Sequence, residues 1–194
     1  MRRQAARKQA SEVTPEPQGS KVDPTTIRRI MGSFPTGVTI VTSRCADGRP
    51  MGLTANAVTS VSLDPPLLLV CLGRSHYSTD VIVKTGAFAV NFLADHQEAV
   101  AQRFATPGND KFRNIAVEEG KLGVPLIPHS LAHAECAVTK IIKAGDHLIL
   151  IGRIVVGQAT NGRPLMYFRR QFGAWPAGDQ PEPATTNQQM GDEQ

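Results

Sequence analysis

The chain carries two consecutive β-rich segments, AECAVTKIIK at residues 134–143 and HLILIGRIVV at residues 147–156. β-branched and aliphatic residues dominate both segments, as is typical of strands. Ala144, Gly145 and Asp146 lie between them and form the kind of short turn that joins antiparallel strands. The sequence therefore predicts a β-hairpin over residues 134–156.

Further strands are expected before and after this hairpin. Runs of β-branched or apolar residues bounded by glycine and proline predict strands at Thr36–Ser43, Leu67–Leu72, Ala87–Leu93 and near Pro164–Arg169, with an extended segment over Gly52–Leu63.

Three short helices are expected beside the strands. Asp23 and Pro24 form a typical helix start, and Gly32 ends that helix. Ser78–Lys84 begins with hydroxyl residues, and His96–Phe104 has apolar residues along one face. Several antiparallel strands with few short helices predict a mainly β fold, namely a β-barrel with peripheral helices.

Length and composition favour one folded domain with a tail at each end. The chain has 194 residues, of which 41% are hydrophobic, as expected of a single packed domain. Residues 1–23 and 176–194 hold too little apolar surface to offset the entropy of ordering, so the domain is expected over residues 24–175. The longest apolar run, Leu67–Leu72, is far shorter than the roughly 20 residues of a membrane-spanning helix. Because no apolar signal-peptide core follows the N-terminus either, the sequence predicts a cytoplasmic protein without a membrane partner.

Charge and cysteine content favour neither a nucleic-acid partner nor a metal site. The formal net charge is +4, and the basic residues near the N-terminus are those of an ordinary solvated tail. Cys45, Cys71 and Cys136 are odd in number and widely spaced, which fits neither a disulfide framework nor a zinc site.

The stretch that suggests chemistry is MGLTANAVTSVSLDPP at residues 51–66. No nucleophile elbow, phosphate loop or metalloprotease motif occurs in the chain. Small residues in this stretch would let a flat ligand approach the backbone, and main-chain groups could bind its carbonyl and imide edges. Tight packing inside a barrel would favour the same small residues, so both interpretations stay open.

Three other stretches could bind a phosphate group. RSHYST at residues 74–79 opens a predicted helix, whose first backbone N–H groups suit an anion. Arg103-Phe104 offers a guanidinium beside an aromatic ring, and Lys111-Phe112-Arg113 adds positive charge. Each signal alone is weak, because Ser and Thr at a helix start are usually only caps.

Taken in order along the chain, these residues resemble the flavin reductase family, the small reductase components of two-component flavin-dependent monooxygenases. The matching segments are FPTGVTIVT at 34–42, GLTAN at 52–56, SVSLDPPL at 60–67, FAVNFL at 88–93, RF at 103–104, DKF at 110–112, GDH at 145–147 and RPLMY at 163–167. They span nearly all of residues 24–175.

The resemblance implies an FMN-binding split β-barrel, a homodimer, and a flavin bound in a groove near the subunit interface. It implies hydride transfer from NADH or NADPH to FMN or FAD, with reduced flavin supplied to a partner monooxygenase. Such transfer is intrinsic to the two cofactors, so a side-chain nucleophile is not needed. The alternatives are an oxidase related to pyridoxamine-phosphate oxidase and a non-enzymatic flavin- or haem-binding module.

The resemblance also implies residue roles. Residues 51–57 would lie along the isoalloxazine ring, residues 71–73 would line the ribityl chain, and His147 would bind the nicotinamide as the catalytic residue. The full expected cofactor-binding set is Met51, Gly52, Leu53, Thr54, Ala55, Asn56, Ala57, Ser60, Ser62, Cys71, Leu72, Gly73, Tyr77, Ser78, Arg103, Phe104, His147 and Arg163, in which Tyr77, Ser78, Arg103 and Phe104 hold the phosphate end.

Overall fold

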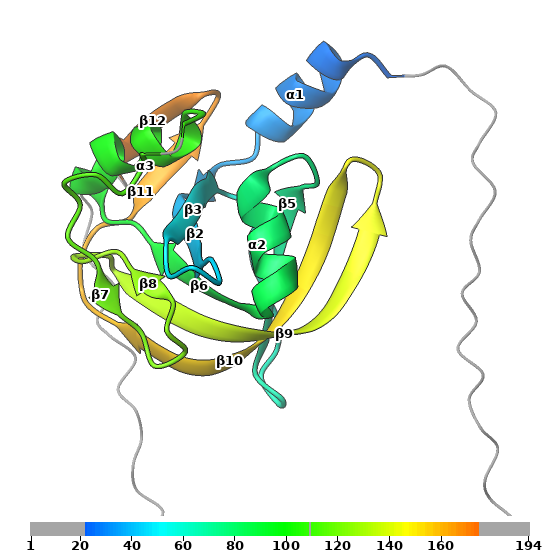
Figure 1. The fold of residues 1–194 in the computed structure, drawn as a ribbon. Coiled ribbons are helices and arrows are strands. Elements are labelled where there is room, and N and C mark those ends of the chain that lie inside the picture. Colours follow the sequence, from blue (N-terminus) through cyan, green and yellow to red (C-terminus); the bar gives the residue numbers. More distant parts are fainter. Residues whose placement is uncertain (1–21, 109, 175–194) are drawn as a thin grey trace, which may run out of the picture.

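The computed structural model describes residues 22–108 and 110–174 (Figure 1). Apart from Val22 and Asp23, the two predicted tails lie outside the described residues.

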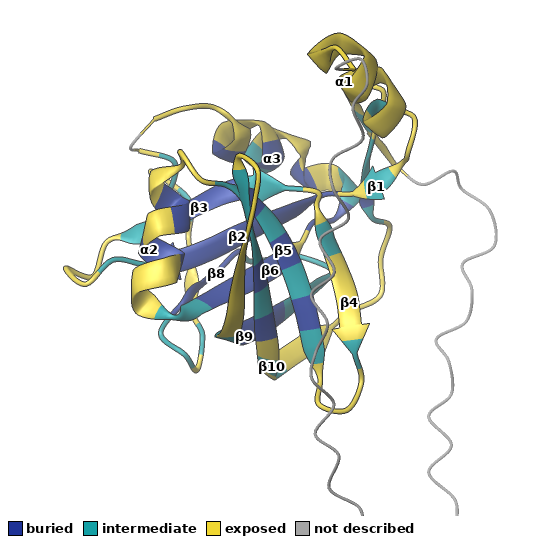
Figure 2. Ribbon diagram, turned by 90° about the vertical axis from the view of Figure 1, so that its right-hand side faces the viewer, coloured by how far each residue is buried: buried dark blue, intermediate teal, exposed yellow. Residues whose placement is uncertain are grey.

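The centre of the fold is a seven-stranded antiparallel sheet, which curls around its own apolar face (Figures 1 and 2). In spatial order its strands are β3 (Pro50–Ala55), β2 (Thr39–Arg44), β6 (Ala87–Phe92), β9 (Ala132–Ala144), β10 (His147–Ala159), β5 (Leu67–Gly73) and β4 (Val58–Ser62). The predicted mainly β fold with peripheral helices is confirmed.

The predicted hairpin is the long β9–β10 pair, and each strand has 13 residues. Only Gly145 and Asp146 separate the two strands, and Gly145 has a positive φ of 59°, as glycine readily allows in a tight turn. The pairing shifts register twice along β10, after Ile151 and after Ile154. Such irregularities bend and twist a strand pair, so they help the sheet to curl.

The predicted strand Thr36–Ser43 is divided at Val38. β1 (Thr36–Gly37) pairs with β11 (Leu165–Phe168) in a separate three-stranded sheet, whereas β2 pairs with β3 and β6. The Val38 backbone bonds to both sides, donating to Leu165 O and accepting from Leu93 N. The sequence of 36–43 could not show this division, because it arises from pairing with β11 and β6, which lie far away along the chain.

A hairpin near the C-terminal end of the described chain was not predicted. β11 pairs with β12 (Gln171–Ala174), and the turn between them consists of Arg169 and Arg170. Both arginines have positive φ angles, 47° and 67°, a conformation that glycine or asparagine usually supplies. The sequence therefore carries no turn signal here. β7 (Glu118–Glu119) and β8 (Pro125–Leu126) form a further short pair that was also not predicted.

Two helices cover β3 and its neighbours. α2 (Tyr77–Thr85) packs on β2 and β3, and buries Val81 and Ile82. α3 (Glu98–Ala105), which follows the 3₁₀ turn η1 (Asp95–Gln97), packs across β3. It buries Ala101 and Phe104, two of the apolar residues that its sequence pattern placed on one face. Both helices therefore lie over β2 and β3, at one end of the strand order of the sheet.

The third helix, α1 (Pro24–Gly32), projects from the body of the molecule (Figures 1 and 2). Asp23 caps it as predicted, because its carboxylate accepts hydrogen bonds from the backbone N–H groups of Thr25 and Thr26. All of its residues from Pro24 to Met31 are exposed. Within residues 22–108 and 110–174, no helix is long and apolar enough to cross a membrane.

Candidate functional site

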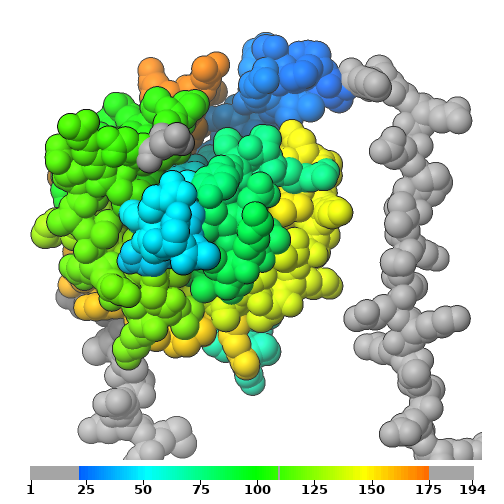
Figure 3. Space-filling model, viewed as in Figure 1, coloured from blue at the N-terminus to red at the C-terminus, as the bar shows by residue number. Residues whose placement is uncertain are grey.

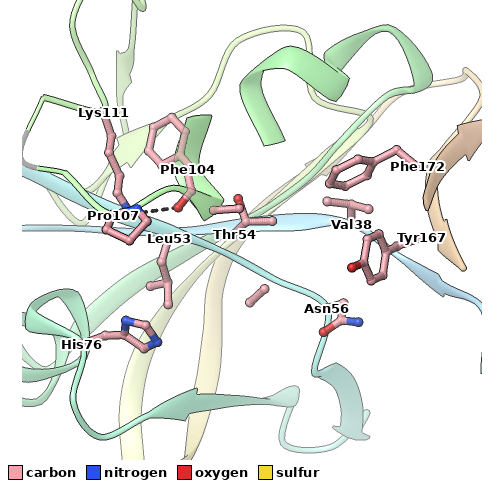
Figure 4. A pocket seen from close by; sticks show the side chains of 12 residues that line it. Val38, Leu53, Thr54, Asn56, His76, Phe104, Pro107, Lys111, Tyr167 and Phe172 are labelled. Carbon is pink, nitrogen blue, oxygen red and sulfur yellow. Dashed lines mark hydrogen bonds between the residues drawn. The ribbon is translucent and has the colours of Figure 1, made fainter. Parts of the chain in front are cut away.

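A cavity of about 360 Å³ lies along β3, the strand at one end of the main sheet. β3 forms its floor, and its other walls come from α3 with the loop after it and from the β11–β12 hairpin (Figure 4). The lining residues are Val38, Leu53, Thr54, Ala55, Asn56, His76, Phe104, Ala105, Pro107, Lys111, Tyr167 and Phe172. Since most of these are apolar or aromatic, this ring cavity, as we call it, suits a flat and largely apolar group.

The two ends of the ring cavity differ in chemistry. Asn56, Tyr167 and Phe172 lie at one end, and Lys111 and His76 lie at the other (Figure 4). The rings of Tyr167 and Phe172 are 5.1 Å apart between centroids. The aromatic end therefore offers a stacking surface beside an amide, and the opposite end is cationic.

Hydrogen bonds from two threonines hold the walls of the ring cavity together. Thr54 donates its hydroxyl to Ala101 O of α3 over 2.6 Å, and Thr39 donates to Ala55 O over 2.6 Å. At the aromatic end, the Asn56 side-chain amide donates to the Thr36 hydroxyl over 3.2 Å. Within the 51–66 stretch, the Thr54 hydroxyl therefore holds α3 against β3.

A second, smaller cavity of about 190 Å³ adjoins the first. Its lining residues are Pro50, Met51, Gly52, Leu53, Ser75, His76, Tyr77, Ser78, Pro107, Gly108, Lys111 and Phe112. The two cavities share Leu53, His76, Pro107 and Lys111, so they lie next to each other. We call the smaller one the tail cavity; the start of α2, coloured green beside β3 in Figure 3, borders it.

The hydroxyls at the start of α2 do not cap that helix. The N-cap residue is His76, whose side chain makes no capping hydrogen bond. Ser78 instead donates to Gly52 O of β3 over 3.3 Å, and Thr79 donates to Gly73 O of β5 over 2.9 Å. The expected role of these hydroxyls as helix starters is thus wrong, because both are buried against strands.

Lys111 lies where the ring cavity and the tail cavity meet. Its ammonium donates to Phe104 O, in the last turn of α3, over 2.8 Å (dashed line in Figure 4). Partial burial lowers the pKa of Lys111, because a desolvated ammonium is less stable in its charged form.

His147 lies outside both cavities, at the start of β10. Its Nδ1 is 2.7 Å from Asp146 Oδ1, and the hydrogen bond from His147, followed by its charge, lowers the pKa of Asp146. His147 pairs across the sheet with Gly73. A Cβ on Gly73 would come within 2.8 Å of the His76 ring, so Gly73 makes room for His76 beside the tail cavity.

The structure gathers half of the expected cofactor-binding residues around the two cavities. The lining residues among them are Met51, Gly52, Leu53, Thr54, Ala55, Asn56, Tyr77, Ser78 and Phe104. The expected residues that line neither cavity are Ala57, Ser60, Ser62, Cys71, Leu72, Gly73, Arg103, His147 and Arg163.

Local contacts explain why several of these residues line neither cavity. Leu72 faces the apolar core and is 2% exposed. Arg103 donates to Arg113 O over 2.7 Å, and Arg163 forms a 2.8 Å ion pair with Asp95.

Sequence reasoning did not assign several lining residues. His76 and Lys111 belong to stretches that the sequence suggested as phosphate-binding, although neither was in the expected cofactor-binding set. Tyr167 belongs to the RPLMY segment and was given no role. Phe172 lies on the unpredicted strand β12, and nothing around it in the sequence marks it.

Comparison with known proteins identifies the family. A model of the flavin reductase like domain family matches residues 31–176. The flavin reductase (NADH) of Kitasatospora aureofaciens is 45% identical over 167 residues, which cover 84% of this chain and 87% of the relative. The chain belongs to the flavin reductase family.

Other members of the flavin reductase family fit the same assignment. The reductase component of the 4-nitrophenol 4-monooxygenase/4-nitrocatechol 2-monooxygenase of Rhodococcus opacus is 40% identical, over 78% of this chain and 81% of that one. The NADH:FAD oxidoreductase of Streptomyces globisporus C-1027, solved in complex with NAD and FAD fragments, superposes with a TM-score of 0.76 at 35% identity, covering 83% of this chain and all of that one. The prediction of an NAD(P)H-dependent flavin reductase is thereby confirmed.

The geometry of the two cavities fits a flavin. The ring cavity combines a flat strand floor with aromatic walls, as an isoalloxazine ring requires. Its cationic end lies beside the tail cavity, on the side toward which a polar chain leaving the ring could extend.

Proposed function

We propose that this flavin reductase takes NADH as its hydride donor and FAD or FMN as its acceptor. Hydride transfer between a nicotinamide and a flavin is the chemistry that the bound cofactors supply. The observation that carries the proposal is the ring cavity, which runs along β3 between Phe104 on one side and the Tyr167–Phe172 pair on the other. Two relatives named for NADH, one of them also for FAD, support this choice of cofactors.

In this proposal the chain contributes position and environment. Leu53, Thr54 and Ala55 would lie along one face or edge of the flavin ring. Asn56 would bind that edge at the aromatic end of the cavity. Holding the two cofactor rings at contact distance accelerates the reaction without any covalent step on a side chain.

His147 would act as the residue that positions the nicotinamide. Asp146 holds the Nδ1 side of its ring through the 2.7 Å contact, which leaves Nε2 for the carboxamide of the donor. Arg74 supports the turn, because its backbone N–H donates to Asp146 O and its guanidinium donates to Gly145 O. The pair is exposed, so a donor molecule could reach it from solvent.

We also infer that the enzyme works as a split-barrel homodimer and hands reduced flavin to a separate monooxygenase component. The dimer is supported by α1, whose apolar side chains Ile27, Ile30 and Met31 are 48%, 62% and 62% exposed. Phe34, just after α1, is 66% exposed, and Leu63, just after β4, is 91% exposed. A second copy of the chain would bury apolar surface of this kind. Delivery to a monooxygenase is supported by relatives named as reductase components of such systems.

The proposal is tested by mixing the purified chain with riboflavin, FMN or FAD and with NADH or NADPH, and by following loss of the reduced nicotinamide. We expect rapid, flavin-dependent oxidation that is faster with NADH than with NADPH. Flavin binding without turnover in any combination would contradict the proposal, and would favour an oxidase or a binding module on the same fold.

A further inference from the structure

Two segments far apart in the sequence meet at one side of the molecule, namely the end of α1 and the turn between β11 and β12 (blue and orange at the top of Figure 3). The backbone N–H of Arg169 in this turn donates to the carbonyl of Gly32, the last residue of α1, over 3.0 Å. A Cβ on Gly32 would lie 4.0 Å from Arg169 Cα. The face of α1 that carries Gly32 therefore faces the hairpin.

This junction carries four arginines. Arg28 and Arg29 precede Gly32 by one helix turn, which places them on the same face of α1, and Arg169 and Arg170 form the hairpin turn. All four are exposed. None of them forms an ion pair with a residue that the structure describes. We call these four residues the arginine patch.

The arginine patch is separate from the apolar face of α1 that we assign to the dimer. That face consists of Ile27, Ile30 and Met31. At about 3.6 residues per turn, Arg29 lies nearly opposite these side chains and Arg28 lies on the flank. A second copy of the chain on one face of α1 therefore leaves the other face free for a different partner.

The conformation of the turn indicates that arginine serves a purpose there. Arg169 and Arg170 have φ angles of 47° and 67°, which glycine or asparagine would adopt at lower cost. Backbone strain of this kind is concentrated at functional positions. The Arg169 guanidinium also lies 5.1 Å from the centre of the Phe168 ring, and Phe168 is 41% exposed. Arginine and aromatic side chains are the residue types most enriched at protein–protein interfaces.

The position of the arginine patch relates it to the flavin site. Tyr167 and Phe172 pair across the two strands that the turn connects, and both line the ring cavity. The turn is therefore built on the same two strands as the aromatic wall against which the flavin ring is proposed to stack. This placement favours a protein that takes up reduced flavin over a nucleic acid or a lipid surface as the partner.

We propose that the arginine patch docks an acidic surface of the monooxygenase component that receives reduced flavin. This inference rests on the proposed delivery of flavin to such a component. Guanidinium groups bind carboxylates through pairs of parallel hydrogen bonds, and opposite charges on two proteins speed their encounter. A monooxygenase docked there lies next to the aromatic end of the ring cavity, so reduced flavin reaches it without release into bulk solvent.

The first test measures binding between the full chain and an oxygenase component. The probe is the purified oxygenase of the Rhodococcus opacus 4-nitrophenol system, whose reductase component is 40% identical to this chain. We expect saturable binding in sedimentation experiments that weakens at high salt. Arg169→Asn/Arg170→Gly removes two charges and supplies turn residues that suit the positive φ angles. This variant, and likewise Arg28→Gln/Arg29→Gln, should raise the dissociation constant about tenfold. Absence of saturable binding by the unchanged chain would overturn the inference.

A matched variant separates the arginine patch from net charge. Lys84→Gln/Lys121→Gln removes two charges at exposed positions outside the patch, and should leave the dissociation constant within about twofold. An equal loss in this variant would mean that only net charge matters, and the inference would be wrong. If the patch variants lose binding to duplex DNA or to phosphatidylserine vesicles but not to the oxygenase, the partner is of another class and the inference is again wrong.

Hand-over of flavin gives a second readout. With cytochrome c added to consume reduced flavin that escapes into solution, the fraction of NADH used for hydroxylation should be lower in both patch variants than in the unchanged chain. Flavin reduction without the oxygenase should stay unchanged, because none of the four arginines lines the ring cavity or the tail cavity. A rise in the KM for NADH or in the flavin dissociation constant would assign the arginines to a cofactor and overturn the inference. If the unchanged chain itself reduces no flavin, the proposed function has failed, and this control shows that separately.

Discussion

Gly52 lies directly against the ring of Phe104. A Cβ at position 52 would come within 2.9 Å of Phe104 Cε1 and 3.2 Å of Val41 O, closer than packed atoms tolerate. Because Gly52 has no side chain, α3 can lie close to β3 and place Phe104 between the ring cavity and the helix. Phe104 in turn packs edge-on against Phe112, with centroids 4.8 Å apart.

Gly52→Ala should therefore loosen the wall that α3 forms. We expect a loss of about 1–3 kcal/mol in the free energy of unfolding, as for overpacking of a core, together with weaker flavin binding. Urea denaturation and flavin fluorescence measure the two effects. Gly173→Ala on β12, where an added Cβ meets nothing within 4 Å, is the matched control and should be close to neutral. Equal behaviour of the two variants would show that the contact with Phe104 is unimportant.

His147→Ala should slow reduction of the flavin by about 10- to 100-fold, the scale of a lost positioning contact. Its flavin dissociation constant should stay the same, because His147 lines neither cavity. Stopped-flow measurement of flavin reduction, with saturating NADH, separates the two quantities. An unaltered rate would remove His147 from the mechanism.

The Asp146 carboxyl group should stay ionised throughout the neutral pH range. The pKa of Asp146 is lowered by the hydrogen bond from His147 and by its charge. A carboxylate with a depressed pKa stabilises the folded state above its unfolded pKa and loses that contribution as pH falls through the folded value. For Asp146 this loss begins below the ordinary value of 3.8. The ¹³C shift of the Asp146 carboxyl group should therefore titrate with a midpoint below 3.8, and a midpoint at or above that value would contradict this.

Charged substitutions on the apolar face of α1 should disrupt the proposed dimer. Ile30→Glu and Met31→Glu change side chains that are each 62% exposed, so they should not unfold the chain. We expect a shift from dimer to monomer in analytical ultracentrifugation. Thr25→Glu adds the same charge on the other side of the helix, near its N-terminus, where acidic groups are favourable, and should leave the dimer intact. A dimer that survives both Ile30→Glu and Met31→Glu would mean that the apolar face of α1 is not at the interface.

The three thiols should differ sharply in reactivity. Burial, followed by the charge of Glu135, raises the pKa of Cys136 to about 12, and its side chain is fully buried. Cys45 and Cys71 are half-buried. Since the thiolate is the reactive form, a thiol reagent at mildly alkaline pH should leave Cys136 unmodified until the chain is unfolded in urea. Modification of Cys136 in the native chain, detected by peptide mapping, would be the contrary result.

Much of the secondary structure could be read from local signals. The β9–β10 hairpin follows from two β-branched runs around a glycine turn, and α1 follows from Asp23 and Pro24. The β11–β12 hairpin could not be predicted, because Arg169 and Arg170 take left-handed conformations that their residue type does not favour.

Some residues of the candidate site could also be predicted from the sequence, whereas others could not. The small and hydroxyl residues of β3 could be recognised in the sequence as a possible ligand-binding strand. A backbone that a flat ligand can approach needs such side chains close together along the chain. Tyr167 and Phe172 had no role assigned from the sequence, and Lys111 was noted only for its charge. All three reach the site through the tertiary positions of the strands and the loop on which they lie. Sequence alone thus determined the family, the strand that forms the floor of the site and the chemistry expected there. The walls and the cationic end were decided only by tertiary structure, because antiparallel pairing and helix packing bring together residues more than one hundred positions apart.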